Sequence, residues 1–136
     1  MIVKRNIIIL IMGLTWLMPM HANNHVDWTK VINAIVQVES KGDVHAVSGN
    51  SVGPMQITPI FVEECNRILS MKNSKTRYTL SDRKNLKKST EMFLLFQEKY
   101  NPTNDIEWAI RAWNGGIRFK TKSTNSYYKK VMAAMK

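Results

Sequence analysis

Apolar residues recur every three or four positions along several stretches of the 136-residue chain, and glycine, proline and polar residues separate these stretches. This spacing predicts amphipathic helices and therefore a mainly α protein. The first predicted helix follows Asp27, a suitable N-cap, and ends near Ser40, where residues 41–43 supply a stop and a turn. Its apolar stripe consists of Trp28, Val31, Ile32, Ile35 and Val38.

One loop and four further helices are predicted downstream. The glycines and prolines of residues 44–59 indicate an ordered loop with room for a short extended piece, and no clear strand pair is evident. The helices are expected over residues 60–69, from Ser81 or Asp82 to Pro102, from Asn104 or Asp105 to the stop at Asn114-Gly115-Gly116, and over residues 125–135. The residues expected to face inward in the last three are Leu86, Phe93, Phe96 and Tyr100, then Ile106, Ala109, Ile110 and Trp113, then Tyr128, Val131 and Met135.

The N-terminal segment differs from the rest of the chain. Lys4 and Arg5 precede an uncharged, largely apolar run over residues 7–18, after which the chain becomes polar. This order is typical of a secretory signal peptide, and the run is shorter than the roughly 20 residues needed to span a bilayer. We therefore expect a signal peptide over residues 1–22 and one exported domain over residues 23–136, located in the periplasm or at the cell envelope.

The net charge of +10 favours polyanionic partners. An exported protein meets cell-wall polymers and anionic lipids before it meets nucleic acid, and the lysines are scattered among several predicted helices. Nucleic acid is therefore not expected as a partner. The charge is interpreted either as nonspecific retention at the envelope or as a solvated surface that keeps the protein soluble.

The chain contains a single cysteine, Cys65, so no internal disulfide is possible. A nucleophilic role would need a nearby histidine. The three histidines, His21, His25 and His45, fall in or near segments predicted as signal or loop. Cys65 is therefore expected to be a buried apolar side chain.

Glu39 is the unusual residue of the first predicted helix. It follows Ile35 by four positions, which places a carboxyl group on the apolar stripe. Loss of hydration and the negative end of the helix dipole should both raise its pKa. A carboxylic acid that keeps its proton near neutral pH is suited to protonating a glycosidic oxygen. The alternative is that Glu39 points into solvent or forms an ion pair with Lys41, Arg111 or Lys130.

The segments that begin at this glutamate resemble those of a known family. They are Glu39-Ser40, Ala46-Val47-Ser48, Gly53-Pro54-Met55-Gln56-Ile57-Thr58-Pro59, Ala112-Trp113-Asn114-Gly115-Gly116 and Tyr127-Tyr128-Lys129-Lys130-Val131. In this order they resemble the soluble lytic transglycosylase and goose-type lysozyme superfamily, over roughly residues 27–135. The departures are Lys41-Gly42-Asp43, Pro54 in place of the common Leu and Trp113 in place of Tyr, and they bear on substrate preference.

The resemblance implies a lysozyme-like helical domain with a substrate cleft and with no metal or organic cofactor. Glu39 would act alone as general acid and base on the glycan strands of peptidoglycan. It would cut between N-acetylmuramic acid and N-acetylglucosamine and leave 1,6-anhydro ends, while Tyr127 holds its carboxyl group. The residues implied to contact substrate are Ser40, Met55, Gln56 and Asn114. Residue pattern alone also allows core packing for Met55, Trp113 and Tyr127 and a helix cap for Asn114.

Two other functions stay open at this point. A hydrolytic muramidase would use water and leave reducing ends, whereas a noncatalytic wall-binding assembly protein would keep the fold without the reaction. Small free-standing enzymes of the family often open the wall for a secretion, conjugation or phage apparatus, so the resemblance implies such a partner. The chain is expected to be a monomer.

Overall fold

The computed structural model describes residues 26–136, and it is mainly α-helical, as the residue pattern predicts. Its elements are α1 (Trp28–Ser40), β1 (Val47–Ser48), β2 (Ser51–Val52), α2 (Pro59–Met71), the 3₁₀ helix η1 (Leu80–Lys84), α3 (Leu86–Tyr100), α4 (Ile106–Gly115) and α5 (Thr121–Ala134). The signal peptide expected over residues 1–22 lies outside the described residues. No helix within residues 26–136 is both long enough and apolar enough to cross a bilayer.

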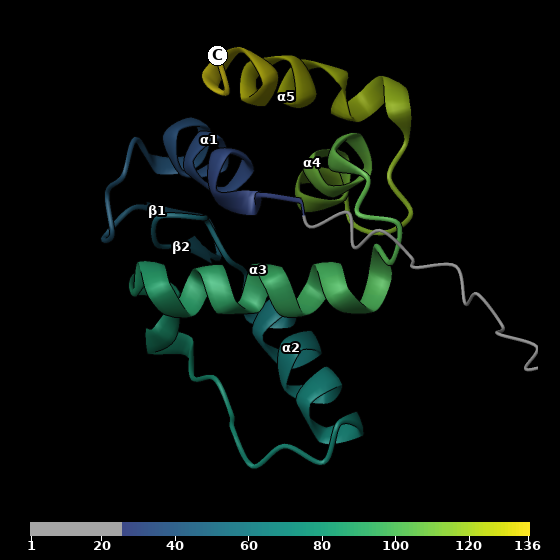
Figure 1. Ribbon diagram of the computed structural model, residues 1–136. Coiled ribbons are helices and arrows are strands. Elements are labelled where there is room, and N and C mark those ends of the chain that lie inside the picture. Colours follow the sequence, from purple (N-terminus) through teal and green to yellow (C-terminus); the bar gives the residue numbers. More distant parts are fainter. Residues whose placement is uncertain (1–25) are drawn as a thin grey trace, which may run out of the picture.

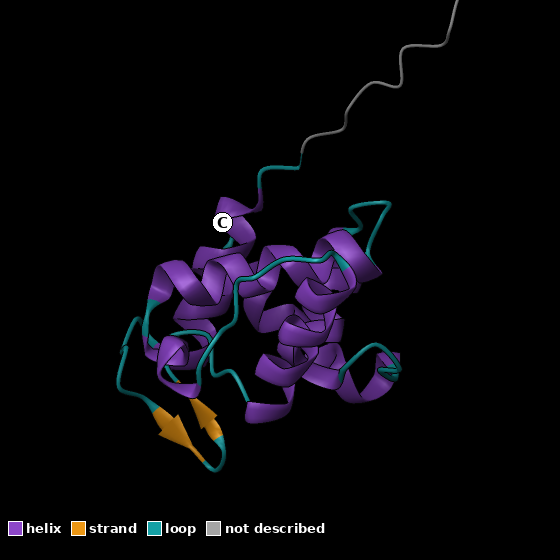
Figure 2. Ribbon diagram, turned by 90° about the horizontal axis from the view of Figure 1, so that it is seen from below, coloured by secondary structure: helices purple, strands orange, loops and turns teal. Residues whose placement is uncertain are grey.

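The last helix, α5, packs against both the first helix, α1, and α4. In Figure 1 it lies above these two helices, while α3 crosses below them and packs against α2. The short β1–β2 hairpin projects from one edge of the helical body, as Figure 2 shows. Because α5 returns to α1, residues from the two ends of the described chain meet, and the candidate site forms where they do.

The first helix, α1, begins and ends where its local signals predict. The Asp27 side chain accepts a hydrogen bond from the Thr29 backbone N–H at 3.0 Å and so caps the helix. At the other end Lys41 adopts the left-handed conformation at φ 52°, and its N–H bonds to the Gln37 carbonyl. The buried face consists of Val31, Ile32, Ala34 and Ile35. This burial fixes the direction in which the last turn of α1, with its glutamate, is presented.

The predicted start of the long helix was wrong. Asn85, rather than Ser81 or Asp82, caps α3 by accepting a hydrogen bond from the Lys88 N–H at 3.0 Å. Asp82 instead accepts from the Thr79 N–H at 2.7 Å and closes a capping box on the preceding 3₁₀ helix, η1. As a result Leu86 lies in the first turn of α3 and is 45% exposed, not inward-facing as expected.

The loop predicted over residues 44–59 contains a strand pair. Val47 pairs with Val52 and Ser48 with Ser51 in an antiparallel hairpin. The short extended piece that the sequence allowed here is thus confirmed. The pairing was missed because each strand has two residues, which is too few for an alternating pattern to appear.

The fifth helix, α5, begins at Thr121, earlier than the predicted residue 125. Its first turn is polar and carries no apolar signal, but Thr124 is 1% exposed and donates a hydrogen bond back to the Lys120 carbonyl at 3.1 Å. Val131 is fully buried, as predicted, and Tyr128 and Met135 are partly buried against the core.

Cys65 is fully buried, as predicted, and its Sγ atom lies 3.7 Å from the Met92 carbonyl oxygen. Burial raises the pKa of its thiol to about 12. Because the thiolate is the reactive form, we expect no alkylation of the folded protein by iodoacetamide at pH 8 and rapid alkylation after denaturation. Mass spectrometry of the two samples measures this difference, and equal labelling of both would contradict the buried position.

Candidate active site at the end of the first helix

Glu39 lies in the last turn of α1 and is half-buried. The hydroxyl group of Tyr127, on α5, donates a hydrogen bond to its Oε1 atom at 2.7 Å. Among the ion pairs within residues 26–136, none includes Glu39, and Arg111 is paired with Glu107 instead. Glu39 therefore does not form the ion pair that the residue pattern also allowed.

The environment of the Glu39–Tyr127 pair favours a protonated acid. Burial raises the pKa of Glu39 above its ordinary value of 4.5, and the hydrogen bond from Tyr127 opposes this rise with a smaller effect. Burial, followed by the negative charge of Glu39, raises the pKa of Tyr127 well above its ordinary range. Tyr127 therefore keeps its proton and stays a donor, which fixes the orientation of the Glu39 carboxyl group.

Ser40 joins the end of α1 to the loop that follows the hairpin. Its hydroxyl group bonds to the Pro54 carbonyl oxygen at 2.8 Å and accepts a hydrogen bond from the Gly42 N–H at 3.1 Å. Pro54 itself is buried. Ser40, which the resemblance implied to contact substrate, thus holds this loop beside Glu39 through its hydroxyl group.

Gln56 fixes the conformation of the same loop. Its backbone is left-handed at φ 53°, a conformation that non-glycine residues adopt rarely and that recurs at functional sites. Its side-chain Nε2 donates to the carbonyl oxygens of Ala46 at 3.1 Å and Gly53 at 2.9 Å. These bonds use the donor side of the amide and hold the Gln56 side chain against the loop.

Met55 and Trp113 connect the loop to the C-terminal part of α4. The Met55 side chain is fully buried in the core, and its carbonyl oxygen accepts a hydrogen bond from the Trp113 indole N–H at 3.2 Å. Trp113 is partly buried and packs edge-on against Phe61, with ring centroids 4.9 Å apart. Met55 therefore has the core-packing role that the residue pattern also allowed.

A pocket of about 420 Å³ lies beside Trp113, between the start of α2 and the end of α4. Its lining residues are Thr58, Ile60, Phe61, Glu64, Phe96, Tyr100, Ala112, Trp113, Gly116 and Ile117. Asn114 is exposed in the last turn of α4, next to this lining, and no described contact joins it to Glu39. Thus Asn114 is brought near the pocket rather than against the acid.

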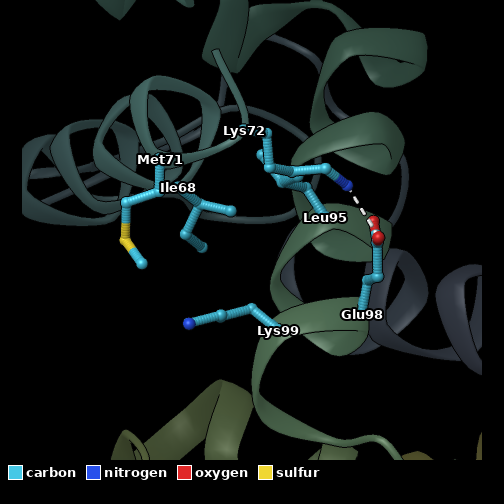
Figure 3. A pocket seen from close by; sticks show the side chains of 6 residues that line it. All are labelled: Ile68, Met71, Lys72, Leu95, Glu98 and Lys99. Atoms are coloured by element: carbon cyan, nitrogen blue, oxygen red, sulfur yellow. Dashed lines mark hydrogen bonds and ion pairs between the residues drawn. The ribbon is translucent and has the colours of Figure 1, made fainter. Parts of the chain in front are cut away.

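A second pocket, of about 280 Å³, lies at the far end of α2. Figure 3 shows Lys72 extended toward Glu98 of α3, and the dashed line marks their ion pair of 2.6 Å. Both side chains are largely exposed, and such a pair contributes at most about 1 kcal/mol. None of the candidate site residues lines this pocket, so it is separate from the site at Glu39.

Arg83 is a structural contributor to the site that sequence reasoning missed. From η1 it donates to the carbonyl oxygens of Asn50 at 3.0 Å and Ile57 at 3.3 Å, and so holds the hairpin from outside. No periodicity or motif marks an arginine that binds backbone atoms 26 to 33 positions away. Within the described part of the chain, no group of three or more metal-ligating side chains comes together.

The contacts of the site join the segments that carry the family resemblance. Ser40 binds the Pro54 carbonyl, Gln56 binds the Ala46 carbonyl, Trp113 binds the Met55 carbonyl, and Tyr127 binds Glu39. The family model described as Transglycosylase SLT domain matches residues 17–135. No curated protein and no solved structure matched the chain. The chain therefore belongs to the transglycosylase SLT domain family, whose activity is directed at peptidoglycan.

Proposed function

We propose that this protein is a peptidoglycan lytic transglycosylase in which Glu39 is the single general acid and base. The observation that supports this best is the half-buried carboxyl group at the end of α1, which Tyr127 holds by a 2.7 Å hydrogen bond and whose pKa burial raises. An acid in this state can donate its proton at a pH where an exposed glutamate has lost it.

The proposed reaction needs one carboxyl group twice. Glu39 first gives its proton to the glycosidic oxygen, so the bond from that oxygen to the anomeric carbon of N-acetylmuramic acid breaks. The C6 hydroxyl oxygen of the same sugar then bonds to that carbon, and its proton passes to the Glu39 carboxylate. Because the attacking hydroxyl is already part of the substrate, proximity replaces a protein nucleophile.

The surroundings of Glu39 are consistent with a mechanism that uses one acid. Two-carboxylate glycosidases place their acids roughly 5 to 9.5 Å apart. Asp43, the nearest acid in sequence, accepts a hydrogen bond from the His45 N–H at 2.8 Å and is exposed in the turn after α1. The Asp43 side chain thus stabilises that turn and is not assigned a role in the reaction.

The loop and the pocket beside Trp113 would bind the glycan strand. Gln56 presents Oε1 to sugar hydroxyl or amide groups, and Asn114 presents its amide from the end of α4. Trp113 supplies a fixed aromatic wall, because its indole N–H is bonded to the Met55 carbonyl. Apolar walls with a few polar groups are usual in ligand sites.

Replacement of Tyr127 by Phe is expected to raise the pKa of Glu39 further, because the hydrogen bond that opposes the rise is lost. The activity that depends on protonated Glu39 should then persist to higher pH, so the basic limb of the pH–rate profile moves upward. At its optimum, kcat should fall roughly tenfold, since the carboxyl group loses its orientation. A pH–rate profile that moves downward would contradict this role for Tyr127.

Analysis of the products distinguishes the proposed reaction from its alternatives. Purified protein is incubated with peptidoglycan in ¹⁸O-labelled water, and the released muropeptides are analysed by mass spectrometry. Transglycosylation leaves 1,6-anhydro ends without label, because no water is added. Labelled reducing ends would instead identify a hydrolytic muramidase, and no release by active-site-intact protein would favour a noncatalytic wall-binding protein.

A protein that acts on the cell wall works outside the cytoplasm, and we propose that residues 1–22 direct its export. N-terminal sequencing of the protein recovered from the cell envelope tests this, with a first residue at position 23 as the expected result. Action as a monomer that opens the wall for a secretion, conjugation or phage apparatus is the accompanying proposal for its biological setting.

A further inference from the structure

Arg111 is the one charged residue in the buried core of residues 26–136. Its side chain is 6% exposed, whereas its ion-pair partner Glu107 is 54% exposed. Burial of a charge is costly unless the group is paired and fully hydrogen-bonded. A pair with a largely exposed carboxylate does little to offset that cost, so the other contacts of Arg111 explain why the charge is tolerated.

The other contacts of Arg111 cross from α4 to α5. Its Nη1 donates to the Thr121 carbonyl oxygen at 3.1 Å and to the Thr124 hydroxyl oxygen at 3.2 Å. Its guanidinium group stacks over the ring of Tyr128, 4.4 Å from the ring centroid. Because the planar guanidinium group both donates hydrogen bonds and stacks on a ring, it fixes the position of α5 in more than one direction.

These contacts flank Tyr127, the residue that holds the candidate acid. Thr124 and Tyr128 are four positions apart and share the face of α5 toward α4. Tyr127 is turned from Tyr128 by about 100° around the helix axis, toward α1 and Glu39. The rotation of α5 that Arg111 sets is thus the rotation that aims the Tyr127 hydroxyl group.

We propose that Arg111 is a positioning residue for Glu39, acting through α5 and the hydroxyl group of Tyr127. This inference rests on the proposed function of Glu39. Small displacements suffice for an effect, because a hydrogen bond of 2.7 Å that lengthens by about 1 Å is no longer a hydrogen bond.

The substitution Arg111→Lys tests the proposal, because it keeps a cation on α4 but removes the planar stack and the forked donors. The pKa of Glu39 is measured by ¹³C NMR of its carboxyl carbon, with the signal assigned by its absence in Glu39→Gln. Arg77→Lys serves as the matched control, because Arg77 is an exposed arginine that binds Ser70, Ser74 and Thr76, away from α5 and from the pocket beside Trp113.

Arg111→Lys is expected to raise the pKa of Glu39, as Tyr127→Phe does. It should also lower kcat by a few-fold and leave KM unchanged. In the Tyr127→Phe background the same substitution should produce no further shift. A shift of equal size in both backgrounds would overturn the proposal, because the effect would then not pass through the Tyr127 hydroxyl group. No shift in either background would overturn it as well.

A second variant keeps the proposal testable if Arg111→Lys does not fold. Thr124→Val removes one acceptor of the arginine with little change in volume, and it should shift the pKa of Glu39 in the same direction by a smaller amount. The NMR measurement does not require an active enzyme. A failure of the proposed function would be seen in a separate experiment, in which Glu39→Gln cleaves the wall at the unchanged rate.

Discussion

Glu39→Gln is expected to lower the rate of peptidoglycan cleavage by about 10²–10⁴-fold. The amide can neither donate a proton to the glycosidic oxygen nor take one from the C6 hydroxyl group, so both proposed roles are lost. It can still accept the hydrogen bond from Tyr127, so the geometry of the site is kept. The rate of release of soluble muropeptides from purified wall measures the effect.

The same substitution should stabilise the folded protein at neutral pH. Burial raises the pKa of Glu39 above its unfolded-state value. The contribution of its side chain to the free energy of unfolding is therefore fully present below pH 4.5 and is lost as pH rises through the folded-state pKa. A neutral amide avoids that loss, and a gain of about 0.5–2 kcal/mol is expected, as at other functional sites where stability is exchanged for activity. Thermal unfolding at several pH values should give a difference that narrows toward acid pH. Full activity of Glu39→Gln would contradict the proposed role.

Gly53→Ala is expected to destabilise the protein by about 3 kcal/mol or more. It should also abolish activity, because the loop would lose its conformation. An added Cβ would lie 1.8 Å from the Arg83 carbonyl oxygen, which is backbone and cannot move aside cheaply. The residue also adopts φ +87°, which disfavours any side chain. Its N–H bonds to the Ala46 carbonyl at 2.8 Å, and its own carbonyl accepts from Gln56, so displacement also releases the amide at the site.

Gly42→Ala is the matched control for this prediction. Gly42 has φ +86°, nearly the same backbone conformation, but nothing lies within 4 Å of an added Cβ. The substitution should therefore cost only the conformational part, about 1–2 kcal/mol. Chemical denaturation of both variants measures the difference. Equal losses would mean that the contact between Gly53 and Arg83 is not tight in solution.

Local signals account for the parts of the fold that the sequence predicted well. The first helix, α1, has a capping aspartate, an apolar stripe at helical spacing and a glycine-containing stop, and each acts within a few residues. The position of Glu39 on the stripe therefore followed from the sequence. Its contact with Tyr127 followed from the family resemblance alone, because no periodicity relates residues 88 positions apart.

The remaining features depend on tertiary contacts that leave no local pattern. Arg83 binds the hairpin backbone from η1, and Arg111 binds α5 from α4. In a sequence each is one more charged residue on a predicted helix or turn. The close approach of Gly53 to Arg83 also leaves no signal in the sequence. A glycine in a loop predicts a turn but does not indicate which residue packs against it.

The ionisation of Glu39 itself tests the central claim most directly. Titration of its ¹³C carboxyl signal in the folded protein should give a pKa above the ordinary value of 4.5, and a still higher value in Tyr127→Phe. This result would place the proton on Glu39 under conditions in which an exposed glutamate has lost it. A pKa at or below 4.5, unchanged by the loss of the Tyr127 hydroxyl group, would contradict the account.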